Sequence, residues 1–219
     1  MTNKSIAVIL SGCGHRDGSE IHEATLTLLA IHKHGADYQC YAPDITQHHV
    51  LNHMTGEEMN ESRNVFVESA RISRGNLKTL QEFNPDKHDA LIIPGGLGAA
   101  KNLSTFAFDG DQYQVNNELQ KAVRSMAERK KPIGALCIAP VILARVLDDI
   151  TVTIGNNRNV AEKIEQMGAV HRETSPTEII VDEENKIVTT PCYMYDSRVD
   201  QVAEGAEKLV KAVLLLTGK

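Results

Sequence analysis

The 219-residue sequence predicts a single α/β domain, in which helices cover both faces of a mostly parallel β-sheet. Three observations indicate this fold class. Short apolar runs of strand length alternate with helical periods along the chain. Two of these runs end in proline or in paired glycines, as strands that enter a turn do. A chain of this length also buries enough surface to fold without disulfides or a structural metal.

The first half of the chain begins with a predicted strand over 5–11, followed by a helix over 19–34. We expect Ser19 to be the N-cap of this helix and Gly35 to end it. A second strand is predicted over 37–43. Residues 44–88 are polar and interrupt the alternation of strands and helices. We interpret them as an insertion that packs on the main sheet, with one helix around 61–70.

The second half resumes the alternation with a fully apolar strand over 89–96 that ends in two glycines. Further strands are predicted over 131–137 and 150–154, and a hairpin over 178–191 with its turn at Glu184 and Asn185. Helices follow at the apolar spacing of 115–126 and over 140–147, 159–168 and 197–217. The last helix is predicted to bury Val199, Val202, Ala206, Leu209, Val213 and Leu216.

Composition and charge exclude several classes of partner. The formal net charge is -6, so there is no basic surface for nucleic acid or for an anionic membrane. The apolar run at the start, Ile6 to Leu10, is too short for a signal peptide, and no run reaches the length of a membrane span. These features predict a soluble, cytoplasmic protein that binds neither nucleic acid nor membrane.

The cysteines and histidines do not form a recognisable metal site. Cys13, Cys40, Cys137 and Cys192 lack C-x-x-C spacing, which argues against both a disulfide framework and structural zinc. His48, His49 and His53 form one histidine group, and His15 with His22 forms another. Neither group has a convincing set of mixed ligands, so we interpret these residues as surface imidazoles and predict no metal.

Cys137 lies on a tight turn, between a strand that ends at Leu136 and a helix that starts near Ala139. Ligands of an open parallel sheet bind beyond the carboxyl ends of its strands, where this turn lies. The dipole of the following helix favours a thiolate, so the pKa of Cys137 is expected to be lowered. A lone cysteine is also commonly a buried core residue, and Cys137 alone does not decide between a nucleophile and a core thiol.

Gly95 and Gly96 end the neighbouring strand and allow the backbone to approach a ligand closely. The N–H groups of Gly96 and Ile138 would together form an oxyanion hole. A simple strand-ending turn is the alternative interpretation.

Glu23 is the candidate acid or base, because it lies one turn into the first helix and can face the same crevice as Cys137. A carboxyl group beside a thiol in a dry pocket has a raised pKa and can move protons near neutral pH. Glu20 competes for this role. Both could instead be solvated acids that complement the helix dipole.

A glycine-rich run after the first strand raises a different possibility. Gly12, Gly14 and Gly18, with Asp44 near the end of the second strand, resemble a nucleotide-binding fingerprint. Asp17 and Glu20 stand where a pyrophosphate would bind, and their charge opposes it.

Four segments together resemble the ThiJ/PfpI branch of the class I glutamine amidotransferase-like superfamily, and within it the glyoxalase-like group of ElbB-type proteins. These segments are SEIHEATLTLLAIHKHG, IIPGGLGAAKNLS, GALCIAP and ENKIVTTP. The resemblance runs through nearly the whole chain. It implies a flavodoxin-like, doubly wound sheet and a homodimer.

The resemblance also implies a chemistry. The nucleophile of the family falls on Cys137, its active-site glutamate on Glu23 and its glycine pair on Gly95 and Gly96. The implied reaction is a glutathione-independent glyoxalase step on a small carbonyl substrate, without a cofactor. It turns glyoxal into glycolate, and the same chemistry would turn methylglyoxal into lactate.

Two departures from the family pattern qualify this implication. Family members with a catalytic histidine carry it directly after the cysteine or in a turn after the next strand, but those positions here read Ile138 and TIGNN. Asn156 or Asn157 would occupy the second position, so slow turnover is expected. Glutaminase action is not expected, because the G-x-C-x-G-x-Q elbow is absent.

The alternative function is a non-catalytic or redox-sensing protein of the same fold. In that hypothesis Cys137 is oxidised to a sulfenic or sulfinic acid. Cys13, at an adjacent strand end, would be the resolving thiol.

Overall fold

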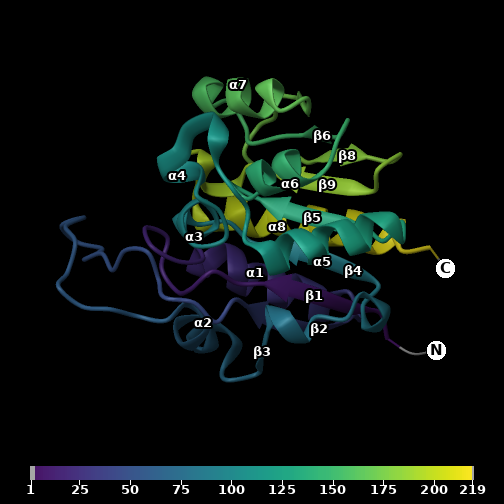
Figure 1. Cartoon of the computed structure of the whole chain (residues 1–219). Helices are drawn as coiled ribbons and strands as arrows, with labels where there is room; N and C mark the ends of the chain where they lie inside the picture. Colours follow the sequence, from purple (N-terminus) through teal and green to yellow (C-terminus); the bar gives the residue numbers. More distant parts are fainter. Residues whose placement is uncertain (1–2, 219) are drawn as a thin grey trace.

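Seven strands form the main sheet, in the order β3-β2-β1-β4-β5-β9-β8 (Figure 1). The structure is a computed structural model that describes residues 3–218, so the predicted domain of 1–219 extends slightly beyond the described part. All neighbouring strands run parallel except β8, which is antiparallel to β9. The predicted flavodoxin-like α/β fold is thereby confirmed. The strands of this sheet are β1 (Ser5–Ile9), β2 (Asp37–Ala42), β3 (Leu77–Thr79), β4 (Ala90–Ile93), β5 (Ile133–Leu136), β8 (Ile180–Asp182) and β9 (Ile187–Thr190).

Helices cover both faces of the sheet (Figure 1). α1 (Ile21–Lys33) packs against α8 (Val199–Leu216) on one face, and α5 (Asn117–Glu128) with α6 (Pro140–Val146) covers the other. Within residues 3–218, no helix is long and apolar enough to cross a membrane. The remaining helices are α2 (Val65–Ser73), α3 (Leu97–Lys101), α4 (Phe106–Asp109) and α7 (Arg158–Gln166).

The last helix buries the face that its apolar spacing predicts, except at its two ends, where Val199 is exposed and Leu216 is only half-buried. Val202, Leu209 and Val213 are fully buried, whereas Val199 is 51% exposed. The helix begins at Val199, so this side chain precedes the first turn that packs on the sheet. The prediction that Val199 is buried was wrong.

The polar segment 44–88 contributes both α2 and the edge strand β3, which pairs parallel with β2. Residues 44–64 form a long loop that extends past the carboxyl edge of the sheet, on the left in Figure 1. β3 was not predicted, because it has only three residues and all of them are half-buried. A short edge strand has no continuous apolar run that would reveal it.

The strand predicted over 150–154 lies outside the main sheet. It is the two-residue β6 (Thr151–Val152), which pairs with β7 (Val170–His171) in a separate small sheet. The short helices α3 and α4 were also not predicted, because five and four residues are too few for a clear apolar period.

The strand order reverses between β1 and β4, which are neighbours in the sheet although they are distant in sequence. β4 and β5 are buried at every position, consistent with central strands that are covered on both faces. In an open α/β sheet, a ligand crevice forms beyond the carboxyl ends of the strands at such a reversal. The fold thus defines where a site is to be sought.

Candidate functional site

A cavity of about 370 Å³ lies beyond the carboxyl ends of β1, β4, β5 and β9. Residues that follow each of these strands line it, together with residues of α3, α4 and α7. In Figure 1 this is the edge where α3 and α4 lie, opposite the two termini. The lining residues are His15, Glu20, Gly96, Leu97, Ala100, Phe106, Ala107, Cys137, Ile138, Asn157, Val160, Tyr193 and Met194.

Cys137 lies on the predicted turn between β5 and α6 and contributes to the cavity wall. Its backbone adopts a φ of 57°, which is rare for a residue other than glycine, and its N–H donates to the carbonyl of Thr190 over 2.9 Å. The residue is 7% exposed. The turn therefore holds the sulfur at the cavity wall and leaves it little contact with solvent.

Glu23 is fully buried on α1 and faces Cys137. Its Oε2 accepts a hydrogen bond of 2.9 Å from the N–H of Gly95, and its Oε1 accepts one of 3.1 Å from the N–H of Tyr193. The thiol of Cys137 lies beside the Glu23 carboxyl, and as a hydrogen-bond donor it opposes part of the rise in the pKa of that carboxyl. Glu23 thus connects α1 to the ends of β4, β5 and β9.

The environment raises the pKa of both groups. Burial, followed by the charge of Glu20, raises the pKa of Glu23 to about 8. Burial, followed by the charge of Glu23, raises the pKa of Cys137 well above its usual value. The prediction of a lowered thiol pKa was wrong, because desolvation outweighs the dipole of α6, a helix of only seven residues.

The two glycines after β4 are required by close packing. A Cβ on Gly95 would meet the Cβ of Cys137 and would lie 2.5 Å from Oε2 of Glu23. Gly96 has a φ of 95°, and a Cβ there would overlap the backbone N of Glu20.

The N–H groups of Gly96 and Ile138 both interact with the sulfur of Cys137. The predicted pair of donors is therefore brought together around the sulfur. A substrate oxygen on a carbon bound to that sulfur would lie near the same two donors.

Glu20 lines the cavity but has a different task from Glu23. It is the N-cap of α1, and its Oε2 accepts a hydrogen bond of 2.7 Å from the N–H of Glu23. The predicted N-cap, Ser19, instead accepts a hydrogen bond of 2.8 Å from the N–H of Ser11. Ser19 thus joins the start of the loop after β1 to its end, one residue before the N-cap.

Cys13 does not share the site with Cys137. It is half-buried, does not line the cavity, and the charges that act on it most are those of Glu68 and Arg71 on α2. The thiol that acts on Cys137 is Cys192, which is fully buried after β9 with a φ of 44°. The expectation that Cys13 is the neighbouring thiol was wrong, because β9, rather than β1, lies beside β5.

Asn157, rather than Asn156, faces the cavity. Asn157 is the N-cap of α7, and its Oδ1 accepts a hydrogen bond of 3.2 Å from the N–H of Val160. Asn156 lines a different hollow beside Glu162 and His171. The two neighbours point to opposite sides, and the capping geometry determines which one reaches the cavity.

Two cavity residues with titratable side chains, His15 and Tyr193, were missed as site residues in the sequence. His15 packs edge-on against His53, with ring centroids 5.0 Å apart, and burial lowers its pKa. Tyr193 follows β9, and its hydroxyl lies 2.8 Å from Nδ1 of His22. Its position just after a strand was the only sequence signal that could have indicated Tyr193 as a site residue.

Within residues 3–218, no three metal-ligating side chains form a group that could hold a metal ion.

The glycine-rich loop after β1 is closed on itself and offers no phosphate cradle. The N–H of Gly14 donates to the carbonyl of Ser19 over 2.9 Å, and the N–H of Gly18 donates to that of Gly14 over 2.6 Å. Asp17 is buried and accepts a hydrogen bond of 2.8 Å from the N–H of Leu51. A bound pyrophosphate would need free N–H groups and no carboxylate in this place.

Comparison with known proteins shows near full-length relatives. A rat protein named ES1 protein homolog, mitochondrial, is 45% identical, and the alignment covers 98% of this chain and 84% of the relative. The human glutamine amidotransferase-like class 1 domain-containing protein 3, mitochondrial, is 44% identical over the same shares.

Solved structures share the fold. The isoprenoid biosynthesis protein with amidotransferase-like domain from Ehrlichia chaffeensis has a TM-score of 0.90 at 37% identity, covering 96% of this chain and 99% of that one. Glyoxalase III from Candida albicans has a TM-score of 0.62 at 15% identity, covering 95% and 97%. At this low identity, the second comparison shows a common fold alone.

The relatives overturn the predicted cytoplasmic location. The rat and human proteins, at 45% and 44% identity, both carry a mitochondrial designation in their names. An organelle address is a short signal read by receptors, so the composition of the folded domain does not reveal it.

The DJ-1/PfpI family matches residues 76–196, which include β4, β5 and β9 and the turn that carries Cys137. Strand order, near full-length relatives and this match agree with the resemblance that the sequence motifs indicated. The chain belongs to the DJ-1/PfpI family.

Proposed function

We propose that this protein is a glutathione-independent glyoxalase-type enzyme that converts glyoxal into glycolate, and methylglyoxal into lactate. The observation that carries the proposal is the contact between the Cys137 thiol, which lines the cavity, and the carboxyl of Glu23, which is buried behind it. Two backbone N–H groups at the same sulfur add to it. Membership of a family whose fold is shared by a glyoxalase III supports this choice.

The proposed reaction is an internal oxidation and reduction that consumes one water. The sulfur of Cys137 bonds to an aldehyde carbon of glyoxal, and the aldehyde oxygen receives a proton, giving a hemithioacetal. Glu23 removes the proton from that carbon and returns one to the neighbouring carbon through an enediol. The product is a thioester, which water cleaves to glycolate and the free thiol. Atoms and electrons balance without an external oxidant or reductant.

The geometry assigns a separate task to each group. Glu23, with its pKa raised to about 8, can accept and release a proton near neutral pH. The N–H groups of Gly96 and Ile138 stabilise negative charge on the substrate oxygen. Because Ile138 occupies a position where family members carry histidine, no imidazole assists the thiol there, and turnover is expected to be slow.

The raised pKa of Cys137 argues against the redox-sensing alternative. Sensor cysteines are exposed and ionise readily. Cys137 is 7% exposed, and its pKa is raised by burial. A thiol that stays protonated at neutral pH reacts slowly with peroxide.

The test is the formation of glycolate from glyoxal by the wild type and by Cys137→Ala. The wild type is expected to form glycolate, and the variant is expected to fall to the uncatalysed rate. Cys40→Ala is the matched control, because Cys40 is a fully buried thiol on β2 that lies outside the cavity. Equal glycolate formation by wild type and Cys137→Ala would overturn the proposal.

We further propose that the chain forms a homodimer, as the family resemblance implies. Sedimentation equilibrium across a range of concentrations measures this directly. A mass equal to that of one chain, 24.1 kDa, at all concentrations would contradict it.

A further inference from the structure

The cavity beside Cys137 is larger than the proposed substrate glyoxal requires. At about 370 Å³ it falls within the range of roughly 300 to 1,000 Å³ that is typical of sites for drug-sized ligands. Glyoxal is the smallest dialdehyde and would leave most of this volume filled with water. The size of the cavity therefore points to a substrate with a longer body.

The reactive part and the apolar part of the cavity wall come from different elements of the fold. The groups proposed to act on the carbonyl are Cys137 and the N–H groups of Gly96 and Ile138, at the ends of β4 and β5, with Glu23 of α1 buried behind the wall. The groups contributed by the short helices α3 and α4 are all apolar: Leu97, Ala100, Phe106 and Ala107. Val160 of α7 and Met194 continue this apolar wall. A small, fully polar substrate would leave these side chains in contact with water.

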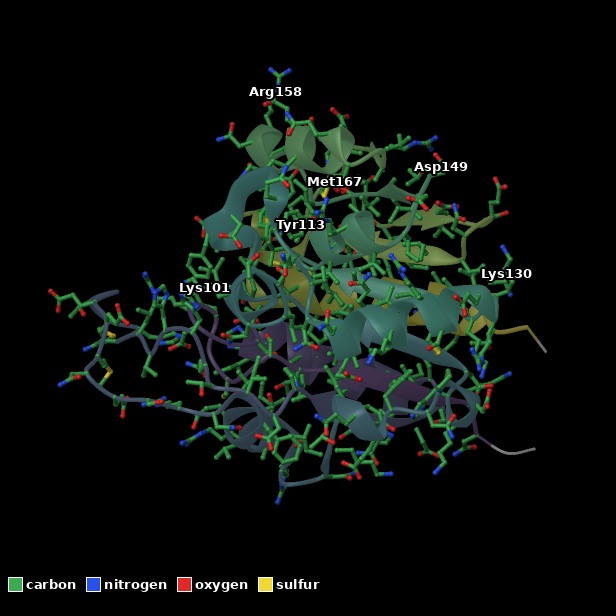
Figure 2. All side chains as sticks on the ribbon, viewed as in Figure 1. Lys101, Tyr113, Lys130, Asp149, Arg158 and Met167 are labelled. Carbon is green, nitrogen blue, oxygen red and sulfur yellow. The ribbon has the colours of Figure 1, made fainter. Side chains whose placement is uncertain are left out.

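Phe106 is a fixed part of the apolar wall. It is 8% exposed, its ring packs edge-on against Tyr113 at 5.0 Å, and Lys163 of α7 lies 5.1 Å from its centroid. Figure 2 shows Tyr113 and Met167 next to each other beneath α7, where the Tyr113 hydroxyl lies 2.9 Å from the Met167 sulfur. The same hydroxyl donates to the carbonyl of Val141 over 2.6 Å. α4, α6 and α7 are thus joined around a preformed apolar surface.

We infer that the natural substrates are α-oxoaldehydes R–CO–CHO in which the apolar group R is larger than methyl, an alkyl chain of several carbons or an aryl ring. This inference rests on the proposed function and names the substrate class for the same site. Cys137 adds to the aldehyde carbon, and the apolar group R extends along Leu97, Phe106 and Val160. The proton of the former aldehyde carbon moves to the ketone carbon, and water releases the 2-hydroxy acid R–CHOH–COOH.

The size of the preference follows from apolar burial. Each methylene removed from water contributes about fourfold in kcat/KM when the transition state holds it as well as the substrate complex does. Four added methylenes would ideally contribute about 200-fold, and incomplete burial reduces this. We therefore expect 2-oxoheptanal to be preferred over methylglyoxal by about 30-fold or more.

The test compares kcat/KM for methylglyoxal, 2-oxoheptanal and phenylglyoxal, with the 2-hydroxy acid product measured in each case. The second protein is Ala107→Leu, in which a larger side chain occupies part of the apolar end. Ala107 is exposed on its other side, so the substitution does not overpack a core. The quantity compared is the ratio of kcat/KM for 2-oxoheptanal to kcat/KM for methylglyoxal, in which the fraction of folded enzyme cancels. This ratio is expected to fall at least threefold in Ala107→Leu.

Each outcome has one meaning. A high ratio in the wild type that falls in Ala107→Leu supports the inference. A wild-type ratio near one overturns the inference and leaves the proposed glyoxalase function intact. A high ratio that Ala107→Leu leaves unchanged overturns the assignment of R to this wall. No 2-hydroxy acid from any of the three substrates overturns the proposed function, and the substrate class with it.

Discussion

The N–H of Gly95 donates a hydrogen bond of 2.9 Å to Oε2 of Glu23, joining the end of β4 to the first turn of α1. This bond holds a buried carboxyl group against the thiol of Cys137. It also explains why residue 95 is glycine, since any Cβ would occupy the space between Glu23 and Cys137. Glu23 and Cys137 are therefore positioned by backbone packing as much as by their own side chains.

Gly95→Ala is expected to lower both activity and stability. The new Cβ must displace Glu23 or Cys137, and overpacking of this kind costs about 1 to 3 kcal/mol of unfolding free energy. Urea unfolding and glycolate formation measure the two effects. Gly75→Ala is the control: it has a φ of 82° and nothing within 4 Å, so it should lose stability but retain activity per folded molecule. Full activity in Gly95→Ala would contradict the described contact.

Glu23→Gln is expected to change how stability depends on pH. The folded protein keeps the proton of Glu23 up to a pH of about 8, whereas the unfolded chain loses it near 4.5. Between these values, the free energy of unfolding of the wild type should fall relative to the variant by about 1.4 kcal/mol per pH unit. Below this window the difference is constant. Titrating groups common to both proteins, such as His88, cancel in the comparison.

A second effect of Glu23→Gln does not depend on pH. Both carboxyl oxygens accept from backbone N–H groups, of Gly95 and Tyr193, and glutamine has only one oxygen. One N–H would lose its acceptor, which costs about 1 to 3 kcal/mol. Urea unfolding at a series of pH values separates this constant offset from the slope. A difference that does not vary with pH would show that the pKa of Glu23 is not raised.

Cys137 is expected to react slowly with iodoacetamide at neutral pH, because burial keeps its thiol protonated. Half-buried Cys13 should be alkylated first, and the rate at Cys137 should rise steeply above pH 9. Peptide mass spectrometry follows each thiol separately. In Glu23→Gln the loss of the carboxylate lowers the thiol pKa, so alkylation at pH 8 should be faster. Rapid alkylation of wild-type Cys137 at pH 6 would contradict a raised pKa.

The paired asparagines before α7 provide a further prediction. Asn157→Ala removes the N-cap and should cost about 1 kcal/mol of stability. Asn157→Asp keeps an accepting oxygen and should restore most of this loss. Asn156→Ala should change stability by less than about 0.5 kcal/mol, because Asn156 is exposed and does not cap the helix. Thermal unfolding of the three variants measures these differences, and equal losses at 156 and 157 would contradict the assigned cap.

The central elements of the fold could be predicted from the sequence because each has a local signal. β4 and β5 are covered on both faces and are therefore continuous apolar runs, while α1 and α8 show a helical period. β3 and α4 gave no such signal, since three or four residues carry no period. Apolar spacing also wrongly predicted that Val199 is buried, because the pattern does not show at which turn a helix begins to pack on the sheet.

The sequence by itself determined the fold class, the turn that carries Cys137 and the glycine pair beside it, because strand ends, Pro140 and Gly95–Gly96 are local marks. Only the tertiary structure decided which groups meet there. Glu23 comes from α1, Tyr193 and Cys192 follow β9, and Asn157 rather than Asn156 faces the cavity. The raised pKa of Cys137 also depends on this assembly. Desolvation and charge act through space, and segments far apart in sequence supply both.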